Sequence, residues 1–466
     1  MELIKDGKTI VLNEQQEEGV NKIQAFLKSK DLFFTLSGPA GTGKTTICLA
    51  AIKGYYNVGV SAPTHQAKAE IENATGISGT TIQSVLGLKP ATDLEEFSQR
   101  NTLFRMGSGE KMGDYSLLVI DESSMINKDL YLAIKEFATF HGTKILFMGD
   151  SNQLPPVGET IGMVFADESI PKHFLTVVER QTFGNPLIEI YGKILSDIES
   201  PVDVYEKKSN VTELKEGYTF YDAPMDFVES IKSYFSFPMT EKNKVIAWTN
   251  ENVRKWNRLI RKSIPELNGT LVVIGESLKA HRTVFSEEVK KAVVIQNSSD
   301  YIVESYKDFT TVIGKEPYQG LLVRIYNEIM PYVKRDIFVP TEQNSLRMFI
   351  EEEQRLSSKA KTEKNASERA QLWARYYQYR NKFFIIGDIL YPNTETVMVA
   401  KDLDYNYAIT VHKSQGSTFA NVFVDMNNID KFWDPKMNPS EINATRNRLK
   451  YVALSRPRKS AHIFQY

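Results

Sequence analysis

The chain has 466 residues, of which 42% are hydrophobic and 25% charged, and at about 150 residues per domain this length predicts roughly three domains. This composition excludes wholesale disorder, collagen and coiled coil, and no uninterrupted apolar stretch reaches the ~18 residues of a membrane span. With 57 basic and 58 acidic residues the net charge is −1, which argues against nucleic-acid binding through bulk positive charge but leaves room for a local basic groove.

The N-terminal segment MELIKDGKTIVLNEQQ has acidic and amide side chains where a signal peptide has a basic start and an apolar run. We therefore expect an intracellular protein. Cys48 is the only cysteine, so no intramolecular disulfide can form, and no Cys/His cluster predicts a structural zinc site.

Between residues 31 and 150, short apolar runs alternate with helical patterns. Each run ends in a Gly, Pro or Asp cluster, as buried parallel strands do where they give way to loops. This repetition predicts a doubly wound α/β sheet that binds ligands at the carboxyl ends of its strands. The runs are Leu32–Leu36, Val58–Ala62, Leu117–Ile120 and Ile145–Met148.

A glycine-rich segment, Gly38-Pro-Ala-Gly-Thr-Gly-Lys-Thr-Thr46, follows the first of these strands and opens a helix. It satisfies the phosphate-loop pattern G-x-x-x-x-G-K-[ST]. Its glycines let backbone N–H groups surround phosphates, and the helix N-terminus adds partial positive charge. Lys44 would reach the β- and γ-phosphates, and the Thr45 hydroxyl would ligate magnesium. A nucleotide with β- and γ-phosphates and Mg²⁺ are therefore the predicted ligands, with an ordinary glycine-rich turn as the alternative.

Two later strand ends carry polar side chains suited to nucleotide hydrolysis. Asp121 and Glu122 follow an apolar strand; Asp121 could hold magnesium, and Glu122 could polarise the attacking water as a general base. Gln153 lies in Gly149-Asp-Ser-Asn-Gln-Leu-Pro-Pro156, where it could orient water or sense the γ-phosphate. A proline-rich turn is the alternative for that segment.

Two arginines are candidates for charge stabilisation in phosphoryl transfer. Arg180 lies in Leu175-Thr-Val-Val-Glu-Arg-Gln181, and Arg456 in Tyr451-Val-Ala-Leu-Ser-Arg456. A planar guanidinium suits the charge that develops on the γ-phosphate. On local evidence alone, an arginine is by default a surface residue.

The second half of the chain changes pattern. Val245–Ala247, followed by the helical Asn252–Arg261, and three C-terminal runs, Tyr407–Val411, Val422–Val424 and Ala461–Phe464, could build a second α/β sheet that is discontinuous in sequence. Charged, helix-favouring residues from about 341 to 385 predict a projecting helical hairpin, with a solvated linker as the alternative. Between about 265 and 390, short β-rich segments predict an antiparallel barrel or sheet: Leu271–Ile274, Val293–Ile295, Tyr301–Val303, Thr310–Ile313 and Gly320–Tyr326.

Taken in order, the motifs resemble those of superfamily 1B helicases, most of all the phage Dda and bacterial RecD-like group. The resemblance runs from about residue 12 to the C-terminus, with weak support between about 265 and 390. It rests on Gly38–Thr46, Ser61–His65, Asp121–Ser124, Gly149–Pro156, Glu179–Gln181, Thr410–Gly416 and Val452–Arg456.

The resemblance implies an α/β fold with two RecA-like P-loop domains, a β-hairpin pin insertion, and an SH3-like β-barrel with a helical tower. The expected boundaries are 1–180 for motor domain 1A, with the pin at about 88–113. Motor domain 2A would comprise 181–264 and 390–466, and domain 2B would comprise 265–389, with its tower at about 341–385.

The resemblance also implies roles for individual residues. Arg180 and Arg456 match the arginines that reach the γ-phosphate across the cleft, and Gly416 lies where the family's motif V approaches the nucleotide. The glutamine that reads adenine corresponds to Gln16, although its neighbour Gln15 is an alternative. The implied nucleotide contacts are Gln16, Gly38, Pro39, Ala40, Gly41, Thr42, Gly43, Lys44, Thr45, Thr46 and Gly416.

In the family, DNA is held by residues that follow the strands of both motor domains. Phe104 resembles the aromatic at the tip of the pin, where a ring could stack on the last base pair; an ordinary core aromatic is the alternative. The matching strand contacts here are Pro63, Thr64, His65, Thr81, Gln83, Thr249, Asn250, Thr410, His412 and Lys413.

The function implied by the resemblance is that of an ATP- and Mg²⁺-dependent DNA helicase moving 5′→3′ on single-stranded DNA. We expect a monomer in the cytoplasm of a bacterial or phage-infected cell, acting on single-stranded and forked DNA. A single-strand-binding protein or replication proteins are candidate partners, and no membrane is expected. Two alternatives stay open: an RNA-directed helicase of the same superfamily, and a nucleotide-gated DNA clamp without unwinding.

Overall fold

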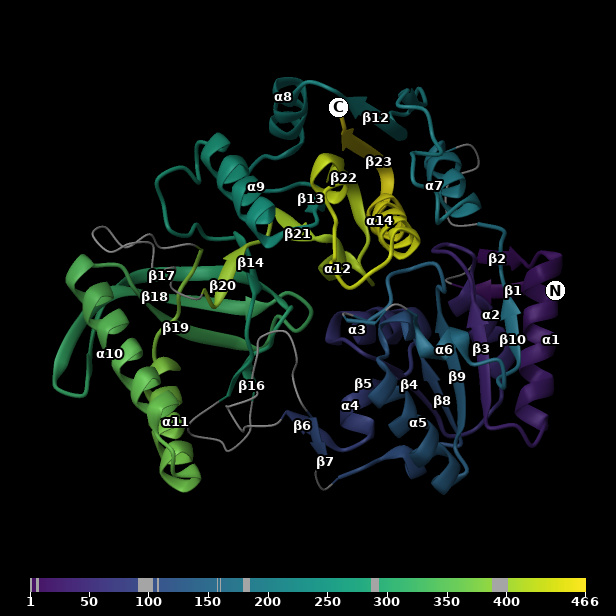
Figure 1. Cartoon of the computed structure of the whole chain (residues 1–466), viewed down its shortest axis with the longest axis horizontal. Helices are drawn as coiled ribbons and strands as arrows, with labels where there is room; N and C mark the ends of the chain where they lie inside the picture. Colours follow the sequence, from purple (N-terminus) through teal and green to yellow (C-terminus); the bar gives the residue numbers. More distant parts are fainter. Residues whose placement is uncertain are drawn as a thin grey trace.

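The computed structural model describes residues 2–5, 8–90, 104–106, 109–156, 158–159, 161–178, 185–285, 293–387 and 401–466. Figure 1 shows two α/β units, one holding the N-terminus and one holding the C-terminus, and a third region with an antiparallel sheet and two long helices. No helix in these ranges is long and apolar enough to cross a membrane.

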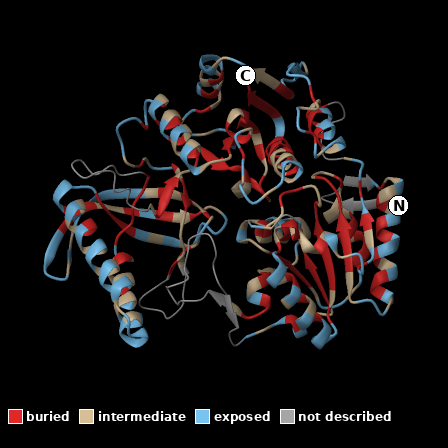
Figure 2. Ribbon diagram, viewed as in Figure 1, coloured by how far each residue is buried: buried red, intermediate tan, exposed pale blue. Residues whose placement is uncertain are grey.

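The first unit is built on a parallel sheet in which strands far apart in sequence are neighbours. Its four central strands are buried along almost their whole length (Figure 2), because helices cover both faces, and this explains their unbroken apolar sequences. The four apolar runs predicted as strands are confirmed as β3, β4, β8 and β9. Within the described residues the order is β10 (Lys172–Phe174), β3 (Phe33–Ser37), β9 (Lys144–Gly149), β8 (Leu117–Ile120), β4 (Val58–Ala62) and β5 (Gly79–Thr81).

Helices pack on the first sheet through two separate apolar cores. One core includes side chains of α1 and α2, among them Val20, Ile47 and the buried Cys48. The other includes Tyr131 and Ile134 of α5. Asn13 begins α1 with a capping box that also uses Gln16. The helices are α1 (Glu14–Lys28), α2 (Lys44–Ile52), α3 (His65–Thr75), α4 (Ile82–Val85), α5 (Lys128–His141) and α6 (Met163–Ala166).

The second unit has a sheet assembled from two stretches of sequence, as predicted. All its described pairings are parallel except that of β11 with β12. The order is β11 (Asn210–Val211), β12 (Gly217–Tyr221), β23 (Pro457–Phe464), β22 (Phe419–Asp425), β13 (Asn243–Ala247) and β21 (Ala408–Thr410). The accompanying helices are α7 (Leu187–Ser196), α8 (Pro224–Tyr234), α9 (Asn250–Ser263), α12 (Val411–Ser414), α13 (Met426–Ile429) and α14 (Pro439–Leu454).

The third region is an antiparallel sheet, but its strands differ from those expected. The segments Tyr301–Val303 and Thr310–Ile313 belong to one long strand with an irregularity between Val303 and Ser305. Leu271–Ile274 is not a strand, because the Val273 N–H donates to the Glu276 carboxylate instead of to a neighbouring strand. The order is β19 (Lys334–Pro340), β18 (Glu316–Asn327), β17 (Asp300–Ile313), β14 (Ser277–Ala280) and β20 (Leu403–Tyr405), and β15 (Val284–Phe285) pairs with β16 (Val293–Ile295).

Strand β20 shows that the C-terminal part of the second parallel sheet begins later than the sequence predicted. Leu278 of β14 pairs with Tyr405, and Leu403 is fully buried in the core of the antiparallel sheet. The chain therefore rejoins the second parallel sheet at Ala408 rather than at residue 390.

Two long helices, α10 (Gln343–Thr362) and α11 (Ala366–Arg380), occupy the segment where a helical hairpin was predicted. They are joined by three residues, and the Tyr376 hydroxyl of α11 donates to the Glu353 carboxylate of α10 at 2.8 Å. At their base Phe349, Tyr379 and Phe383 form an aromatic cluster. The helical alternative is therefore the one observed, and the charged residues cover its exposed sides (Figure 2).

Two further antiparallel pairs complete the description. Near the N-terminus, β1 (Glu2–Lys5) pairs with β2 (Lys8–Val11). In the segment expected to hold a pin, β6 (Leu88–Pro90) pairs with β7 (Phe104–Met106). The Phe104 backbone lies in β7, whereas its side chain and the residues between the two strands lie outside the described part of the chain.

Candidate nucleotide site and strand-contact face

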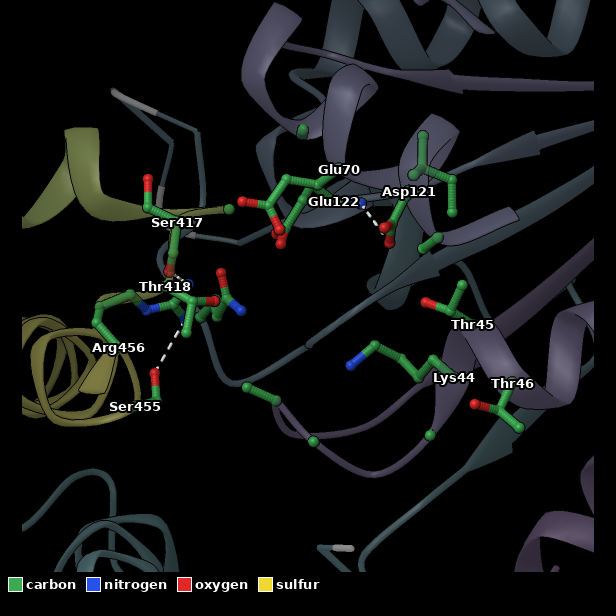
Figure 3. A pocket seen from close by; sticks show the side chains of 18 of the residues that line it. Lys44, Thr45, Thr46, Glu70, Asp121, Glu122, Ser417, Thr418, Ser455 and Arg456 are labelled. Carbon is green, nitrogen blue, oxygen red and sulfur yellow. Dashed lines mark hydrogen bonds between the residues drawn. The ribbon is translucent and has the colours of Figure 1, made fainter. Parts of the chain in front are cut away.

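A cavity of about 520 Å³ lies between the two α/β units (Figure 3). From the first unit it is lined by the glycine-rich loop and by the residues that end β8 and β9. From the second unit it is lined by residues 416–418 and by Ser455 and Arg456. Two halves that are far apart in sequence thus enclose one space.

The loop between β3 and α2 has the backbone of a phosphate cradle. Gly41 and Gly43 have φ values of 85° and 87°, which favour glycine. A side chain at Gly38 would place its Cβ 2.8 Å from the Leu175 carbonyl oxygen, so only glycine fits there. Lys44 donates through Nζ to the carbonyls of Gly38 and Pro39, at 2.6 and 3.0 Å. The ammonium group thus lies against the inside of the loop.

The structure distinguishes the two glutamines that the sequence left as alternatives. Gln16 is buried and lines the cavity, where its Nε2 donates to the Thr42 carbonyl at 3.0 Å. Gln15 points elsewhere, because its amide is hydrogen-bonded to Thr176. Only Gln16 is therefore placed to contact a nucleotide.

Asp121 and Glu122 reach the cavity from the end of β8. Asp121 accepts the Glu122 N–H at 2.9 Å, and Glu122 has a positive φ of 51°, which turns its side chain into the cleft (Figure 3). Burial and the adjacent Asp121 raise the pKa of Glu122 to about 7, against the opposing charges of Arg456 and Lys44. The pKa of Asp121 is also raised, chiefly by burial. A carboxylate with a pKa near neutrality is suited to accept a proton.

Gln153 and Thr45 also line the cavity from the first unit. Gln153 is buried in the loop after β9, and its Oε1 has no hydrogen-bond partner among the described residues. Glu122 Oε2 is likewise buried and unpartnered there. Buried oxygens without partners that line one cavity are available to bind a ligand or water there.

The second unit supplies a glycine and an arginine. Gly416 has a φ of 72°, and a Cβ there would lie 3.6 Å from Ala67 Cβ and 3.8 Å from Glu122 Cγ. Arg456 is buried and held by its own unit, with Nε donating to the Val452 carbonyl and Nη2 to Ser455 Oγ. Figure 3 shows it across the cavity from Lys44. The other arginine candidate, Arg180, lies outside the described residues.

Sequence reasoning missed a contact that joins the two units beside this cavity. The Tyr451 hydroxyl of α14 donates to the buried Asp150 carboxylate in the loop after β9. Gln66 Nε2 also donates to Ser417 Oγ across the cleft, at 2.6 Å. Asp150 and Tyr451 both belong to motifs that the sequence singled out, but nothing in the sequence indicates that residues 301 positions apart touch.

The comparisons with known proteins agree with this geometry. A family model described as an AAA domain matches residues 11–216. The chain is 29% identical over 288 residues to the ATP-dependent DNA helicase dda of enterobacteria phage T4, covering 59% of this chain and 62% of that protein. It is 32% identical over 185 residues to the ATP-dependent RecD2 DNA helicase of Deinococcus radiodurans, covering 39% of this chain and 24% of that protein.

The ordered motifs and these relatives lead to one family. The chain is similar to helicases of superfamily 1B. It spans about three fifths of the T4 protein and about a quarter of RecD2. The crystal structure of Pif1 helicase from Candida albicans matches with a TM-score of 0.49 and 19% identity, over 98% of this chain and 95% of that chain.

The residues that the motifs match to DNA contacts lie where strands give way to helices. Thr64, Thr249 and Thr410 are the N-cap residues of α3, α9 and α12, and each accepts a backbone N–H through its side chain. His65 and Asn250 are exposed at the first positions of α3 and α9. The capping fixes the backbone at these positions.

The remaining matched residues divide between the two units. Thr81 precedes α4 and its hydroxyl is 2.9 Å from Ser84 Oγ, while Gln83 Nε2 donates to the Pro63 carbonyl at 3.3 Å. The structure thus brings together Pro63 and Gln83, which lie 20 residues apart. His412 is in the second unit, where burial lowers its pKa.

Lys413 lies in a group of cations between the second unit and the antiparallel sheet. Its Nζ is 3.3 Å from Nδ1 of His281. Burial, together with the charges of Lys279 and Lys401, lowers the pKa of Lys413 to about 8. Both neighbours are engaged in ion pairs, Lys279 with Asp300 and Lys401 with Asp404. Lys279 is buried, Lys401 and Lys413 are half-buried, and two of the three are paired with carboxylates, so this group is a largely buried cluster of cations.

Proposed function

We propose that the protein is an ATP-dependent DNA helicase that moves 5′→3′ along single-stranded DNA and unwinds duplexes ahead of it. One observation carries the proposal: a single cavity collects the phosphate loop, two acidic side chains and Gln153 from one unit, and Gly416 and Arg456 from the other. A site divided between two units couples the state of the nucleotide to the distance between them. The names of the T4 and Deinococcus relatives support DNA as the substrate.

In this proposal each side chain of the first unit has a defined task. Lys44 leaves its carbonyl partners to bind the β- and γ-phosphates, and Gln16 contacts the adenine. Glu122 accepts a proton from the attacking water, which its raised pKa favours. Gln153 orients that water or senses the γ-phosphate.

The donor set fits magnesium. The Thr45 hydroxyl and the Asp121 carboxylate are hard oxygen ligands beside the phosphate loop (Figure 3), and the unpartnered Glu122 oxygen belongs to the residue that follows Asp121 and lines the same cavity. When bound, the ion would neutralise charge on the phosphate oxygens. Thr45 and Asp121 would hold it.

Movement along DNA would result from the second unit closing on the first. Arg456, together with Arg180, would stabilise the transition state from across the cleft, so hydrolysis requires the units to approach. Closure would draw the second unit toward the first, and product release would let it relax. We assign 1–180 to motor domain 1A, and 181–264 and the segment from Ala408 onward to domain 2A, because Leu403–Tyr405 pairs in the antiparallel sheet.

The single strand would run over the capped strand ends of both units. Exposed side chains at helix starts, together with the half-buried Lys413, would supply the contacts to phosphates on a protein with almost no net charge. The full set of proposed DNA contacts is Pro63, Thr64, His65, Thr81, Gln83, Thr249, Asn250, Thr410, His412 and Lys413.

Strand separation would fall to the insertion of the first unit. We propose that the pair β6–β7 is the base of a pin that carries Phe104, and that residues 265–389 form an SH3-like domain whose helices α10 and α11 brace it. A base-pair step is worth ~1.4 kcal/mol of stacking, and a ring stacked on a base supplies ~1–3 kcal/mol. A wedge of this kind can therefore offset the opening of one pair at a time.

The experiment that tests the proposal uses two partial duplexes that differ only in having a 5′ or a 3′ single-stranded tail. Both are incubated with the protein, ATP, Mg²⁺ and a trap strand. Release of strand from the 5′-tailed duplex alone supports the helicase and its direction. Release from the 3′-tailed duplex alone contradicts the direction, and ATP hydrolysis without strand release contradicts unwinding. Stimulation of hydrolysis by poly-uridine as strong as by DNA would contradict the preference for DNA.

A further inference from the structure

A second cavity, of about 200 Å³, also spans both units. The first unit lines it with Ser124, Ser151 and Gln153 and with apolar residues such as Phe165, and the second unit lines it with Arg448 of α14. Gln153 lines both this cavity and the nucleotide cavity. The volume is several times the ~30 Å³ that one water molecule occupies in the liquid.

The polar groups of this cavity are poorly satisfied. Ser124 Oγ and Gln153 Oε1 are buried, with residue exposures of 3% and 5%, and have no hydrogen-bond partner among the described residues. No hydrogen bond or ion pair within the described ranges engages the half-buried Arg448. Burial accordingly lowers the pKa of Arg448, and the Glu199 carboxylate is the charge that opposes this. Buried polar atoms without partners are costly, so a ligand or water is expected here.

The chemistry of these groups selects the ligand. A guanidinium and a serine hydroxyl donate to an oxyanion, and Arg is the side chain best matched to phosphate. Gln153 Oε1 accepts, so a ligand that also carries a hydrogen-bond donor would satisfy it. Inorganic phosphate near neutral pH has both features, because it carries negative oxygens and at least one P–OH group.

The position of Arg448 links the cavity to the rest of α14. Arg448 and Tyr451 are three residues apart, so they face the same side of the helix, and Tyr451 contacts Asp150 in the loop that also carries Ser151 and Gln153. Arg456 follows at the end of the same helix and lines the nucleotide cavity. Opening of the cleft would therefore withdraw Arg448 and Arg456 from the first unit together.

We propose that the second cavity binds inorganic phosphate after hydrolysis and holds it until the cleft opens, with Arg448 as its main anion contact. This inference rests on the proposed ATP hydrolysis for its biological meaning, because hydrolysis would produce phosphate in the nucleotide cavity, which shares Gln153 with the second cavity. The binding itself concerns only the ADP-bound protein. It can therefore be measured without turnover.

The test measures binding of inorganic phosphate to the full-length protein saturated with ADP and Mg²⁺, by phosphorus NMR titration or calorimetry. Arg448→Ala is compared with wild type, with Arg448→Lys, which keeps a cation, and with Arg446→Ala. Arg446 is on the same helix, but it bonds the Phe432 carbonyl instead of lining the cavity. Melting temperatures of all variants establish that each is folded.

We expect Arg448→Ala to weaken phosphate binding about tenfold, which corresponds to roughly 1.4 kcal/mol, while Arg448→Lys and Arg446→Ala stay close to wild type. ADP affinity should not change in any variant. Equal phosphate binding by wild type and Arg448→Ala, or equal weakening by Arg446→Ala, would overturn the inference. Absence of ATP hydrolysis by the wild type would instead refute the proposed function, and the phosphate titration would still decide whether the cavity binds the anion.

Discussion

The two parallel sheets face the nucleotide cavity with opposite ends of their β-strands. In the first unit the lining groups follow the carboxyl ends of β3, β8 and β9, which are neighbours in the sheet. In the second unit they precede the amino ends of strands: Gly416–Thr418 lead into β22, and Arg456 leads into β23. Phe419 and Pro457, the first residues of those strands, are paired in register.

This difference separates two kinds of task. Loops at the carboxyl ends of adjacent parallel strands converge, so they can surround phosphates and a metal ion. The second sheet keeps its carboxyl ends for Thr249 and Thr410, which cap helices on the face matched to DNA contacts. The first sheet thus carries the groups suited to nucleotide hydrolysis. In the second sheet, the amino ends of the β-strands face the nucleotide cavity, and the carboxyl ends carry residues matched to DNA contacts.

Removing the lysine of the first unit should have the largest effect. Lys44→Ala removes the positive charge from the phosphate loop, so DNA-stimulated ATP hydrolysis should fall below detection, at least about a thousandfold. Lys53→Ala, at the exposed end of the same helix, is the matched control. A phosphate-release assay with saturating single-stranded DNA measures both. Persistent turnover by Lys44→Ala would show that the first sheet does not carry the chemistry.

Removing the arginine of the second unit should separate hydrolysis from binding. Arg456→Ala should lower kcat about a thousandfold, because its charge is needed in the transition state, while ATP affinity changes much less. Arg458→Ala, two residues later and exposed on β23, should behave as wild type. Nucleotide titration and single-turnover hydrolysis give the two quantities. An equal loss of ATP affinity and of kcat would indicate that Arg456 contributes to nucleotide binding rather than specifically to the transition state.

The pH dependence should report Glu122 of the first unit. Its pKa in the free protein is about 7, so kcat/KM for ATP should rise about tenfold per pH unit below 7 and level off above it. A profile measured from pH 5.5 to 8.5 with excess Mg²⁺ checks this. A flat profile over that range would contradict a general base with this pKa.

The same carboxyl should cost stability at high pH. Its folded-state pKa lies above its ordinary value of 4.5, so the folded chain binds more protons than the unfolded chain between these values. Stability should therefore fall as pH rises through this window, and Glu122→Gln should raise the Tm by about 2–4 °C at pH 8 but not at pH 4.5. Thermal unfolding followed by fluorescence at both pH values measures the difference, and an equal shift at both would refute the electrostatic explanation.

The smallest effect is expected at the contact between the units. Tyr451→Phe keeps the ring but removes the hydrogen bond to Asp150, which should reduce DNA stimulation of the ATPase roughly three- to tenfold and leave the unstimulated rate unchanged. Tyr191→Phe is the control, because its ring packs edge-on against Tyr451 in the same core. Loss of stimulated and basal rates alike would indicate a folding defect rather than weakened coupling.

The same contrast explains what the sequence could and could not predict. Strand, glycine loop and helix are contiguous around Lys44, and local pattern was enough to place that loop, the Asp121–Glu122 pair and Gln153 in one cavity. Arg456 has no such local signal, because its place depends on two strands meeting at their amino ends. Tyr451 and Asp150 were missed for the same reason.

The antiparallel region was predicted least accurately. The sequence of β17 predicted two short strands instead of one long strand. Its outer half, beyond Ser305, is largely exposed, so it lacks the regular alternation of apolar residues that a half-buried strand shows. Leu403–Tyr405 pairs with a strand more than 120 residues earlier, which only the assembled sheet reveals.

Cys48 gives the chain a practical property. It is the only cysteine, is fully buried on α2, and burial raises the pKa of its thiol to about 12, so it is almost entirely protonated at neutral pH and unreactive toward maleimides. Dyes can therefore be attached to newly introduced surface cysteines without first replacing a native one. A donor on α5 and an acceptor on α8 would follow the approach of the two units in single molecules, on an otherwise natural sequence.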